Sequence, residues 1–143
     1  MDIDFASLKS VNDDVVGWIY VEAVPDINYP IVHGKDNETY LHRTYEKNYN
    51  FAGTIFVDYE NKGDFSDCNT IVYGHNMKNG SMFGTLDDYK SEKWQTEHPV
   101  IEFFVDGEVR EYEVFAAAES RVLYEDEEGF RYYRSGGDLS EEE

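Results

Sequence analysis

Residues 100–120, VIEFFVDGEVREYEVFAAAES, form the clearest structural element of the sequence. Two runs rich in β-branched and aromatic residues flank the dipeptide Asp106-Gly107. Such a dipeptide readily adopts the positive φ values of a tight type I′ turn between antiparallel strands. The stretch therefore predicts a β-hairpin.

Four further stretches have the composition of strands. They are 15–24 (VVGWIYVEAV), 27–32 (INYPIV), 53–60 (GTIFVDYE) and 69–75 (NTIVYGH). Pro30 has no N–H to donate to a neighbouring strand, which predicts that it lies at a sheet edge or a bulge.

Short helices are predicted between these strands. Phe5, Leu8 and Val11 are spaced three apart, as on the apolar side of a short helix. Residues 35–45 favour a helical turn with Asp36 or Asn37 as its cap, and 81–89 and 91–98 favour short helices. About five to seven strands with short helices predict a mainly β fold, a barrel or a sandwich.

Composition bounds the function. The 143 residues suit one domain, and their net charge of −19 would repel a phosphate backbone, so we expect no nucleic-acid partner. An acidic surface most simply serves solubility. No apolar stretch reaches the roughly 20 residues of a membrane span, and the first residues lack the features of a signal peptide.

His75 is the candidate catalytic residue. It follows a predicted strand within IVYGHNMKNGSMFG (71–84), where a glycine-containing corner would expose its ring, although a lone histidine is often structural. Cys68 is the only cysteine, and seven residues of extended chain, roughly 20 Å, would separate it from His75 on the opposite strand face. Cys68 is therefore not expected to be the nucleophile. The four histidines lack zinc-ligand spacing, so we expect no metal or other cofactor.

Several stretches resemble class B sortases, the cell-surface cysteine transpeptidases of Gram-positive bacteria, in order and spacing. They are NDDVVGWIYV, INYPIVHGKDNETYL, GTIFVDYEN, NTIVYGHNMKNGSMFGTLDDY and HPVIEFF…EYEVFAA, from about Val11 to Ala118. The resemblance implies a β-barrel of eight strands with an N-terminal helix, of which this chain would hold about six strands. The family's Cys attacks a sorting motif resembling Asn-Pro-x-Thr-Asn to give a thioester, which an amine of a cell-wall peptide or a pilin resolves.

The resemblance also implies roles for four residues. His75 would be the general acid/base that protonates the leaving amine. Asn37, Leu41 and Tyr73 would line the groove for the sorting peptide, although each could equally serve packing. We expect Asn37 and Leu41, four apart, to share one face of a helical turn.

The family's nucleophile and arginine follow on two later strands that we do not find here. Arg121, Arg131 and Arg134 precede those strands, so none is expected to take the arginine's role. Ser140 and Glu143 have the spacing of a capping box. These residues suit either a frayed acidic tail or the start of a helix in a longer protein, and we favour the second. We therefore expect a single domain over 1–143 that stops at the first turn of the helix between the sixth and seventh strands.

Three functions remain open at this stage. The first is a class B sortase of which this chain carries the His but not the Cys or Arg, so that it is inactive alone. The second is a catalytically dead sortase-like module that binds a sorting peptide, and the third is a β-rich interaction domain. The family implies a membrane-anchored protein at the cell surface, and an unclosed barrel would leave an edge through which two copies could pair.

Overall fold

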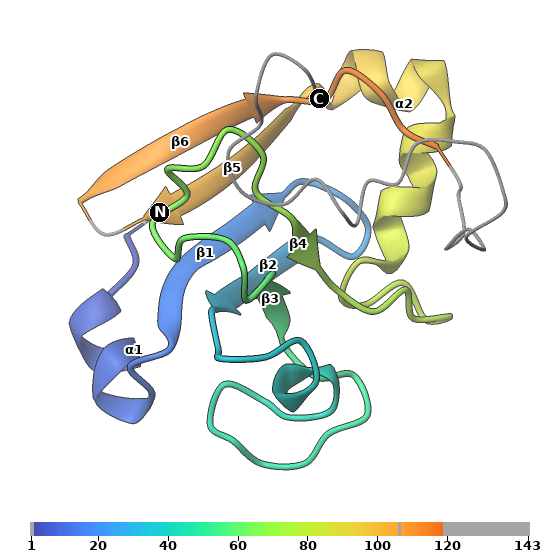
Figure 1. Cartoon of the computed structure of the whole chain (residues 1–143). Coiled ribbons are helices and arrows are strands. Elements are labelled where there is room, and N and C mark those ends of the chain that lie inside the picture. Colours follow the sequence, from blue (N-terminus) through green and yellow to red (C-terminus); the bar gives the residue numbers. More distant parts are fainter. Residues whose placement is uncertain (1, 106, 119–143) are drawn as a thin grey trace, which may run out of the picture.

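The computed structural model describes residues 2–105 and 107–118. Within them, six strands form one curled sheet in the order β4-β3-β2-β1-β5-β6 (Figure 1). The strands are β1 (Val15–Val21), β2 (Ile27–Val32), β3 (Ile55–Val57), β4 (Val72–Tyr73), β5 (Val100–Val105) and β6 (Glu108–Glu113). The helices are α1 (Phe5–Val11), η1 (Thr39–Leu41), η2 (Gly84–Lys90) and α2 (Glu92–Glu97), of which η1 and η2 are 3₁₀. The mainly β prediction is confirmed.

The predicted hairpin is formed by β5 and β6. Their register pairs Val105 with Glu108, and Gly107 has a φ of +87°, whereas Asp106 lies outside the described residues. β6 is an outermost strand, and its Val109 and Tyr112 are exposed. The hairpin therefore attaches to the sheet through β5, which pairs with β1.

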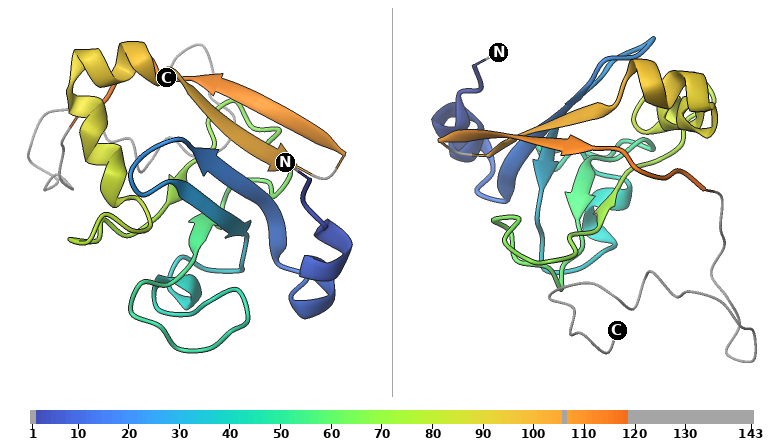
Figure 2. Two further views of the ribbon diagram at one scale, coloured as in Figure 1. Left: turned by 180° about the vertical axis from the view of Figure 1, so that it is seen from behind. Right: turned by 90° about the horizontal axis from the view of Figure 1, so that it is seen from above.

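Apolar clusters lie on both faces of the sheet. Ile55 and Val57 belong to one cluster and Phe56 to the other, because successive strand side chains point to opposite faces. η2 contributes Tyr89 to the first cluster, and η1 contributes Tyr40 to the second. Figure 2 shows α1 and the η2–α2 pair at opposite ends of the sheet. Burying one aliphatic side chain fully stabilises the fold by about 1.5–3 kcal/mol. β3, with only three residues, therefore contributes to the core on both faces of the sheet.

β2 and β3 run parallel, whereas the other neighbouring strands pair antiparallel. Ile31 pairs with Ile55 and Val32 with Phe56. A tight turn cannot join parallel neighbours, so residues 33–54 must cross back along the sheet. This crossing segment carries η1 and much of the candidate site.

The prediction that Pro30 lies at a sheet edge or a bulge was wrong. β2 is an inner strand, and Pro30 pairs with Trp18 of β1. The pairing of β1 with β2 is irregular between Val15 and Gly17 of β1 instead. β3 pairs with β2 only from Ile31 onward, so the missing N–H of Pro30 removes no bond of the β2–β3 ladder.

The strands predicted over 53–60 and 69–75 are real but much shorter. β3 and β4 pair only through Phe56 with Tyr73 and Val57 with Val72. The chain turns away after Val57 because the carboxylate of Asp58 accepts the N–H of Glu60 at 2.9 Å. Local composition overestimates strand length where such side-chain bonds compete with the ladder.

The first helix occupies the predicted residues. Asp4 caps α1 by accepting the N–H of Ser7 at 3.1 Å, and Phe5 and Leu8 contact the core. Val11 does not, since 55% of its surface is exposed. The three-residue spacing therefore predicted the helix correctly but placed one residue too many in the core.

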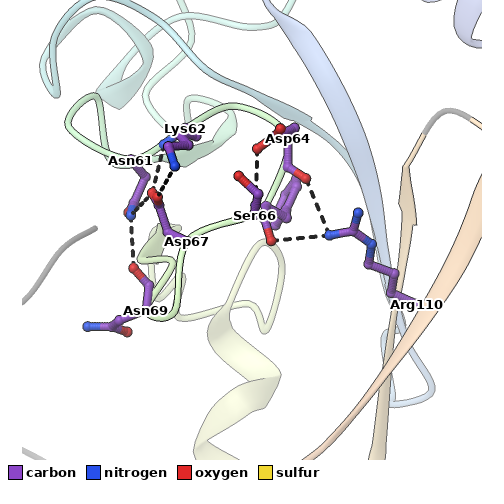
Figure 3. Close-up of polar contacts among 8 residues, drawn as sticks. Asn61, Lys62, Asp64, Ser66, Asp67, Asn69 and Arg110 are labelled. Carbon is purple, nitrogen blue, oxygen red and sulfur yellow. Dashed lines mark hydrogen bonds and ion pairs between the residues drawn. The ribbon is translucent and has the colours of Figure 1, made fainter. Parts of the chain in front are cut away.

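The loop between β3 and β4 is tied together by side chains (Figure 3). Asn61 is 97% buried: its Nδ2 donates to Asp67 and to the carbonyl of Asn69, and its Oδ1 accepts the N–H of Ile71. Arg110 of β6 donates to the carbonyls of Asp64 and Phe65. The loop is thus held both internally and against the hairpin.

None of the helices described is long and apolar enough to cross a bilayer. The capping-box residues Ser140 and Glu143, and Arg121, Arg131 and Arg134, lie outside the described residues.

Candidate active site

Tyr73 and His75 lie at the end of β4, separated by a glycine that packing requires. A Cβ at Gly74 would lie 2.5 Å from the side chains of both Ile55 and Phe83. Real Cβ atoms do not approach heavy atoms so closely, so only glycine allows β4 to leave the sheet here. Gly74 therefore determines where the imidazole of His75 emerges.

The chain after His75 folds into a compact turn. The N–H of Phe83 donates to the carbonyl of His75 at 2.8 Å, and Asn76 pairs with Met82 in a β-bridge. The hydroxyl of Tyr29 on β2 accepts the N–H of Met82 at 2.9 Å. The backbone of His75 is thus fixed by its own turn and by the sheet.

The ring of His75 is fixed by the backbone of η1. Its Nε2 lies 2.7 Å from the carbonyl oxygen of Leu41. A carbonyl can only accept, so Nε2 carries a proton in this hydrogen bond. Nδ1 is then the nitrogen without a proton in the neutral ring.

The backbone of Gly53 packs closely against the carbonyl of Leu41. Gly53 has a φ of +65°, and a Cβ on it would lie 2.4 Å from the carbonyl oxygen of Leu41. The N–H of Thr54 donates to the carbonyl of Tyr40 at 3.1 Å, which joins η1 to the start of β3. The acceptor for His75 is therefore part of a rigid backbone junction.

Two aromatic rings that the sequence analysis did not single out stack beside His75. The centroid of His42 lies 5.4 Å and that of Phe51 5.8 Å from the His75 ring, with interplanar angles of 23° and 24°. His42 also bonds through Nδ1 to the carbonyl of Phe51 at 2.9 Å. Phe51 is 62% exposed, so one side of the stack faces solvent. The path of residues 33–54 brings His42 and Phe51 beside His75. A regular sequence spacing could not have predicted this contact, because it depends on the tertiary fold.

Asp36, rather than Asn37, caps the turn that contains Leu41. Its carboxylate accepts the N–H of Thr39 at 2.8 Å and the N–H of Glu38 at 3.1 Å. These bonds, and one from the Thr39 hydroxyl, lower the pKa of Asp36. Asn37 precedes η1, so the expectation that Asn37 and Leu41 share a helical face was wrong: the turn is a single 3₁₀ turn that starts at Thr39.

Asn37 and Tyr73 meet instead at Asp58, another residue that the sequence analysis did not single out. The Nδ2 of Asn37 donates to Asp58 Oδ2 at 3.2 Å, and the hydroxyl of Tyr73 donates to the same oxygen at 2.9 Å. Asp58 is 94% buried. A carboxylate directly after a fully apolar strand is the sequence signal that could have identified it.

The four predicted site residues form two pairs, and both pairs have a side chain in the same apolar cluster. His75 and Leu41 join through a ring and a carbonyl, and Asn37 and Tyr73 join through a carboxylate. The side chains of Leu41 and Tyr73 pack against the same apolar cluster. Cys68 is exposed and lies between Asn61 and Ile71, which are joined by a hydrogen bond from the N–H of Ile71 to Asn61. Within residues 2–105 and 107–118, no group of three or more His, Cys, Asp or Glu is arranged to hold a metal ion.

Two curated relatives match most of the chain. Sortase B of Listeria monocytogenes is 41% identical over 117 residues, which cover 82% of this chain and 47% of the relative. Sortase B of Staphylococcus aureus is 38% identical over 99 residues, which cover 69% of this chain and 40% of the relative. The chain therefore spans less than half the length of these relatives. No family model matches the chain.

Solved structures agree with this relationship. Sortase B of Clostridium perfringens has a TM-score of 0.74 at 38% identity, with 79% of this chain and 61% of that chain covered. Sortase B of Bacillus anthracis, solved in complex with AAEK2, has a TM-score of 0.77 at 39% identity, with 88% and 59% covered. The shared fold and identity show that this chain belongs to the class B sortase family.

Proposed function

We propose that the chain carries the histidine part of a class B sortase-type transpeptidase site. The observation that supports this most directly is the fixed imidazole of His75, whose Nε2 is bonded to Leu41. A general acid/base must present one defined nitrogen to the reacting group, and this bond leaves Nδ1 for that task.

The reaction begins when a cysteine thiolate attacks the carbonyl carbon of the scissile peptide bond. A C–S bond forms, the C–N bond breaks, and the leaving amine takes a proton from the Nδ1–H of the His75 imidazolium. An amine of a cell-wall peptide or a pilin then attacks the thioester and gives a proton to His75. The thiolate is released, so the histidine and the cysteine return to their starting states.

The sorting peptide would be held by Asn37, Leu41 and Tyr73. Asn37 and Tyr73 offer polar groups fixed by Asp58, and Leu41 offers an apolar surface close to His75. Backbone and side-chain amides of a sorting motif match these groups, since each amide offers both a donor and an acceptor.

We infer that a thiol other than Cys68 supplies the nucleophile. Cys68 is the single cysteine of the sequence, and the network around Asn61 holds its loop. The second candidate is a sortase-like module that binds a sorting peptide without cleaving it. The surface-anchored setting and the amine partner belong to the whole enzyme and are part of this proposal.

Two measurements on the 143-residue chain test the proposal. A fluorogenic Asn-Pro-x-Thr-Asn peptide should give no turnover, and cleavage that disappears in Cys68→Ala would show that Cys68 is the nucleophile after all. An NMR titration with the same peptide should shift Asn37, Leu41, Tyr73 and His75 together. Shifts confined to β6, for example at Val109 and Tyr112, would refute the groove.

A further inference from the structure

A cavity of about 500 Å³ lies beside η1, and none of the four predicted site residues lines it. Thr39 and Tyr40 of η1 form part of its wall, and the charged residues of the wall are Asp14, Lys35, Arg43 and Lys47. Its volume falls within the range of about 300–1,000 Å³ that small-molecule sites occupy. The cavity is therefore large enough for a ligand.

The charge of this wall is opposite to the charge of the whole chain. Lys and Arg make up 12 of 143 residues and the net charge is −19, yet three of the seven lining residues are basic. Three cations and one carboxylate, that of Asp14, leave two net positive charges around the cavity. Such a concentration of one sign raises the local concentration of ligands of the opposite sign.

The three cations are not neutralised by ion pairs. Lys35, Arg43 and Lys47 take part in none of the salt bridges between described residues, and all three are exposed. The pKa of Asp36 is lowered mainly by the N–H and hydroxyl of Thr39, and Lys35 makes only a minor contribution. The ammonium and guanidinium groups are therefore available to an anion.

The backbone holds two of these cations at fixed places around the cavity. Arg43 pairs with Tyr49 in a β-bridge, and its Nη1 donates to the carbonyl of Lys47 at 3.3 Å. The N–H of Lys47 donates in turn to the carbonyl of Thr44 at 2.8 Å. These bonds close the loop after η1 and bring Arg43 and Lys47 to the same wall, with Lys35 supplied by the segment after β2.

The conformation of Lys47 favours a role for its side chain. Lys47 has a φ of +68°, in the left-handed region that glycine adopts most readily. The turn alone would be more stable with glycine, and the exposed side chain of Lys47 contributes no buried packing. Residues kept in such a conformation often serve a function, and here the side chain adds a charge to the cavity.

The one acidic residue of the wall has a structural partner. The hydroxyl of Tyr40 donates to Asp14 Oδ2 at 2.7 Å and accepts from the Nδ2 of Asn12, also at 2.7 Å. Tyr40 is only 2% exposed, so Asp14 satisfies a buried hydroxyl. The carboxylate is thus explained without a ligand, and its charge opposes the binding of an anion.

We propose that this cavity binds a phosphate group, with Lys35, Arg43 and Lys47 as its hydrogen-bond donors. A phosphate group carries up to two negative charges, which match the excess of the wall, and Arg and Lys are its usual partners. The net charge of the chain disfavours a long nucleic acid, but salt screens exposed charges beyond about 10 Å, so a small anion responds mainly to the wall. This site does not rest on the proposed peptide site.

The test is an NMR titration of the 143-residue chain with inorganic phosphate and with glycerol 3-phosphate. It is run at constant ionic strength and above the second pKa of a phosphate ester, about 6. The amide signals of residues 35 and 43–47 should shift together. Acetate, with a single charge, should bind about tenfold more weakly.

Charge variants show whether the wall itself binds the anion. Arg43→Gln should weaken the binding of phosphate about tenfold, because it removes a charged donor. Asp14→Asn should have the opposite effect, about threefold tighter binding, because it removes the one like charge and can still accept from Tyr40.

Lys47→Gly separates binding from folding. It removes the charge and relieves the positive φ, so it should be at least as stable as the unmodified chain and yet bind about tenfold more weakly. Lys93→Gln is the matched control, because it removes an exposed cation of α2 and changes the net charge equally. It should change the affinity less than twofold.

The outcomes decide the proposal. If neither phosphate compound shifts residues 35 and 43–47, the site is refuted. If Lys47→Gly and Lys93→Gln weaken binding equally, the anion responds only to net charge and the site is equally refuted. With the expected variant effects, tighter binding of the ester identifies a phosphorylated small molecule as the ligand, and tighter binding of inorganic phosphate identifies the free ion.

Discussion

The Nε2 atom of His75 lies 2.7 Å from the carbonyl oxygen of Leu41, a residue 34 positions earlier in the chain. The bond joins the end of β4 to the crossing segment between β2 and β3. It assigns the proton of the neutral ring to one nitrogen and leaves the other for chemistry. The geometry of the candidate site therefore depends on a backbone group rather than on another catalytic side chain.

The first prediction concerns the aromatic stack. Replacing Phe51 or His42 by Ala removes a ring contact of about 0.5–1.5 kcal/mol and should loosen the His75 ring. Nitrogen-15 NMR of the imidazole at alkaline pH should show the Nε2–H tautomer in the unmodified chain and a mixture in the variants. His98, which stacks on Trp94, is an internal control and should not change. A dominant Nδ1–H tautomer of His75 in the unmodified chain would contradict the described bond.

The second prediction compares two glycines with positive φ. Gly53→Ala should destabilise the chain by roughly 2–4 kcal/mol, because it adds backbone strain and a clash with the Leu41 carbonyl. Gly107→Ala should cost only about 1 kcal/mol, since no atom lies within 4 Å of the added Cβ. Urea unfolding of both variants measures the difference. Equal costs would mean that the junction of Gly53 with Leu41 can relax.

The third prediction uses the lowered pKa of Asp36. The N–H and hydroxyl of Thr39 and the N–H of Glu38 stabilise the charged carboxylate in the folded chain. A group with a lowered folded pKa contributes stability above its unfolded value, about 3.9, and loses it as the pH falls through the folded value.

The free energy of unfolding of the native chain and of Asp36→Asn, measured from neutral pH to about pH 2, should therefore converge at the acid end. Glu38→Gln removes an exposed charge from the same turn and serves as the control. A difference for Asp36→Asn that does not depend on pH would show that its charged form has no special role.

The fourth prediction concerns self-association through β6. This edge strand carries Glu108, Glu111 and Glu113 against one cation, Arg110, so pairing two copies would bring like charges together. Salt screens such repulsion, so any dimer that forms through β6 should be more populated at high ionic strength. Sedimentation at two salt concentrations measures this, with Val109→Glu as a variant that adds a further like charge and should prevent it. Salt-independent association would indicate another interface.

Local patterns predicted the elements whose contacts are close in sequence. The hairpin around Gly107, the strand from Val15 and the helix from Phe5 all formed where propensity and periodicity placed them. The lengths of β3 and β4 could not be predicted in this way, because Asp58 and Asn61 divert the backbone into side-chain bonds.

The candidate site was only partly visible in the sequence. His75 could be singled out from its strand-end position and from the family resemblance. His42, Phe51 and Asp58 could not, because their importance comes from contacts across the parallel crossing. The spacing of Asn37 and Leu41 was misleading, since it assumed a regular α-helix where the chain makes one 3₁₀ turn.

The parallel pairing of β2 with β3 also bears on the order in which the molecule folds. β1 and β2 are joined by a short connection, so their contacts cost little loop-closure entropy and can form early. The contacts of His75 and Asp58 with the crossing segment close much longer loops, which costs more entropy. These contacts stabilise the chain only after β3 has docked. The candidate site is therefore completed late in folding. A chain that pairs β1 with β2 correctly still lacks the contacts of His75 and Asp58 until residues 33–54 have docked.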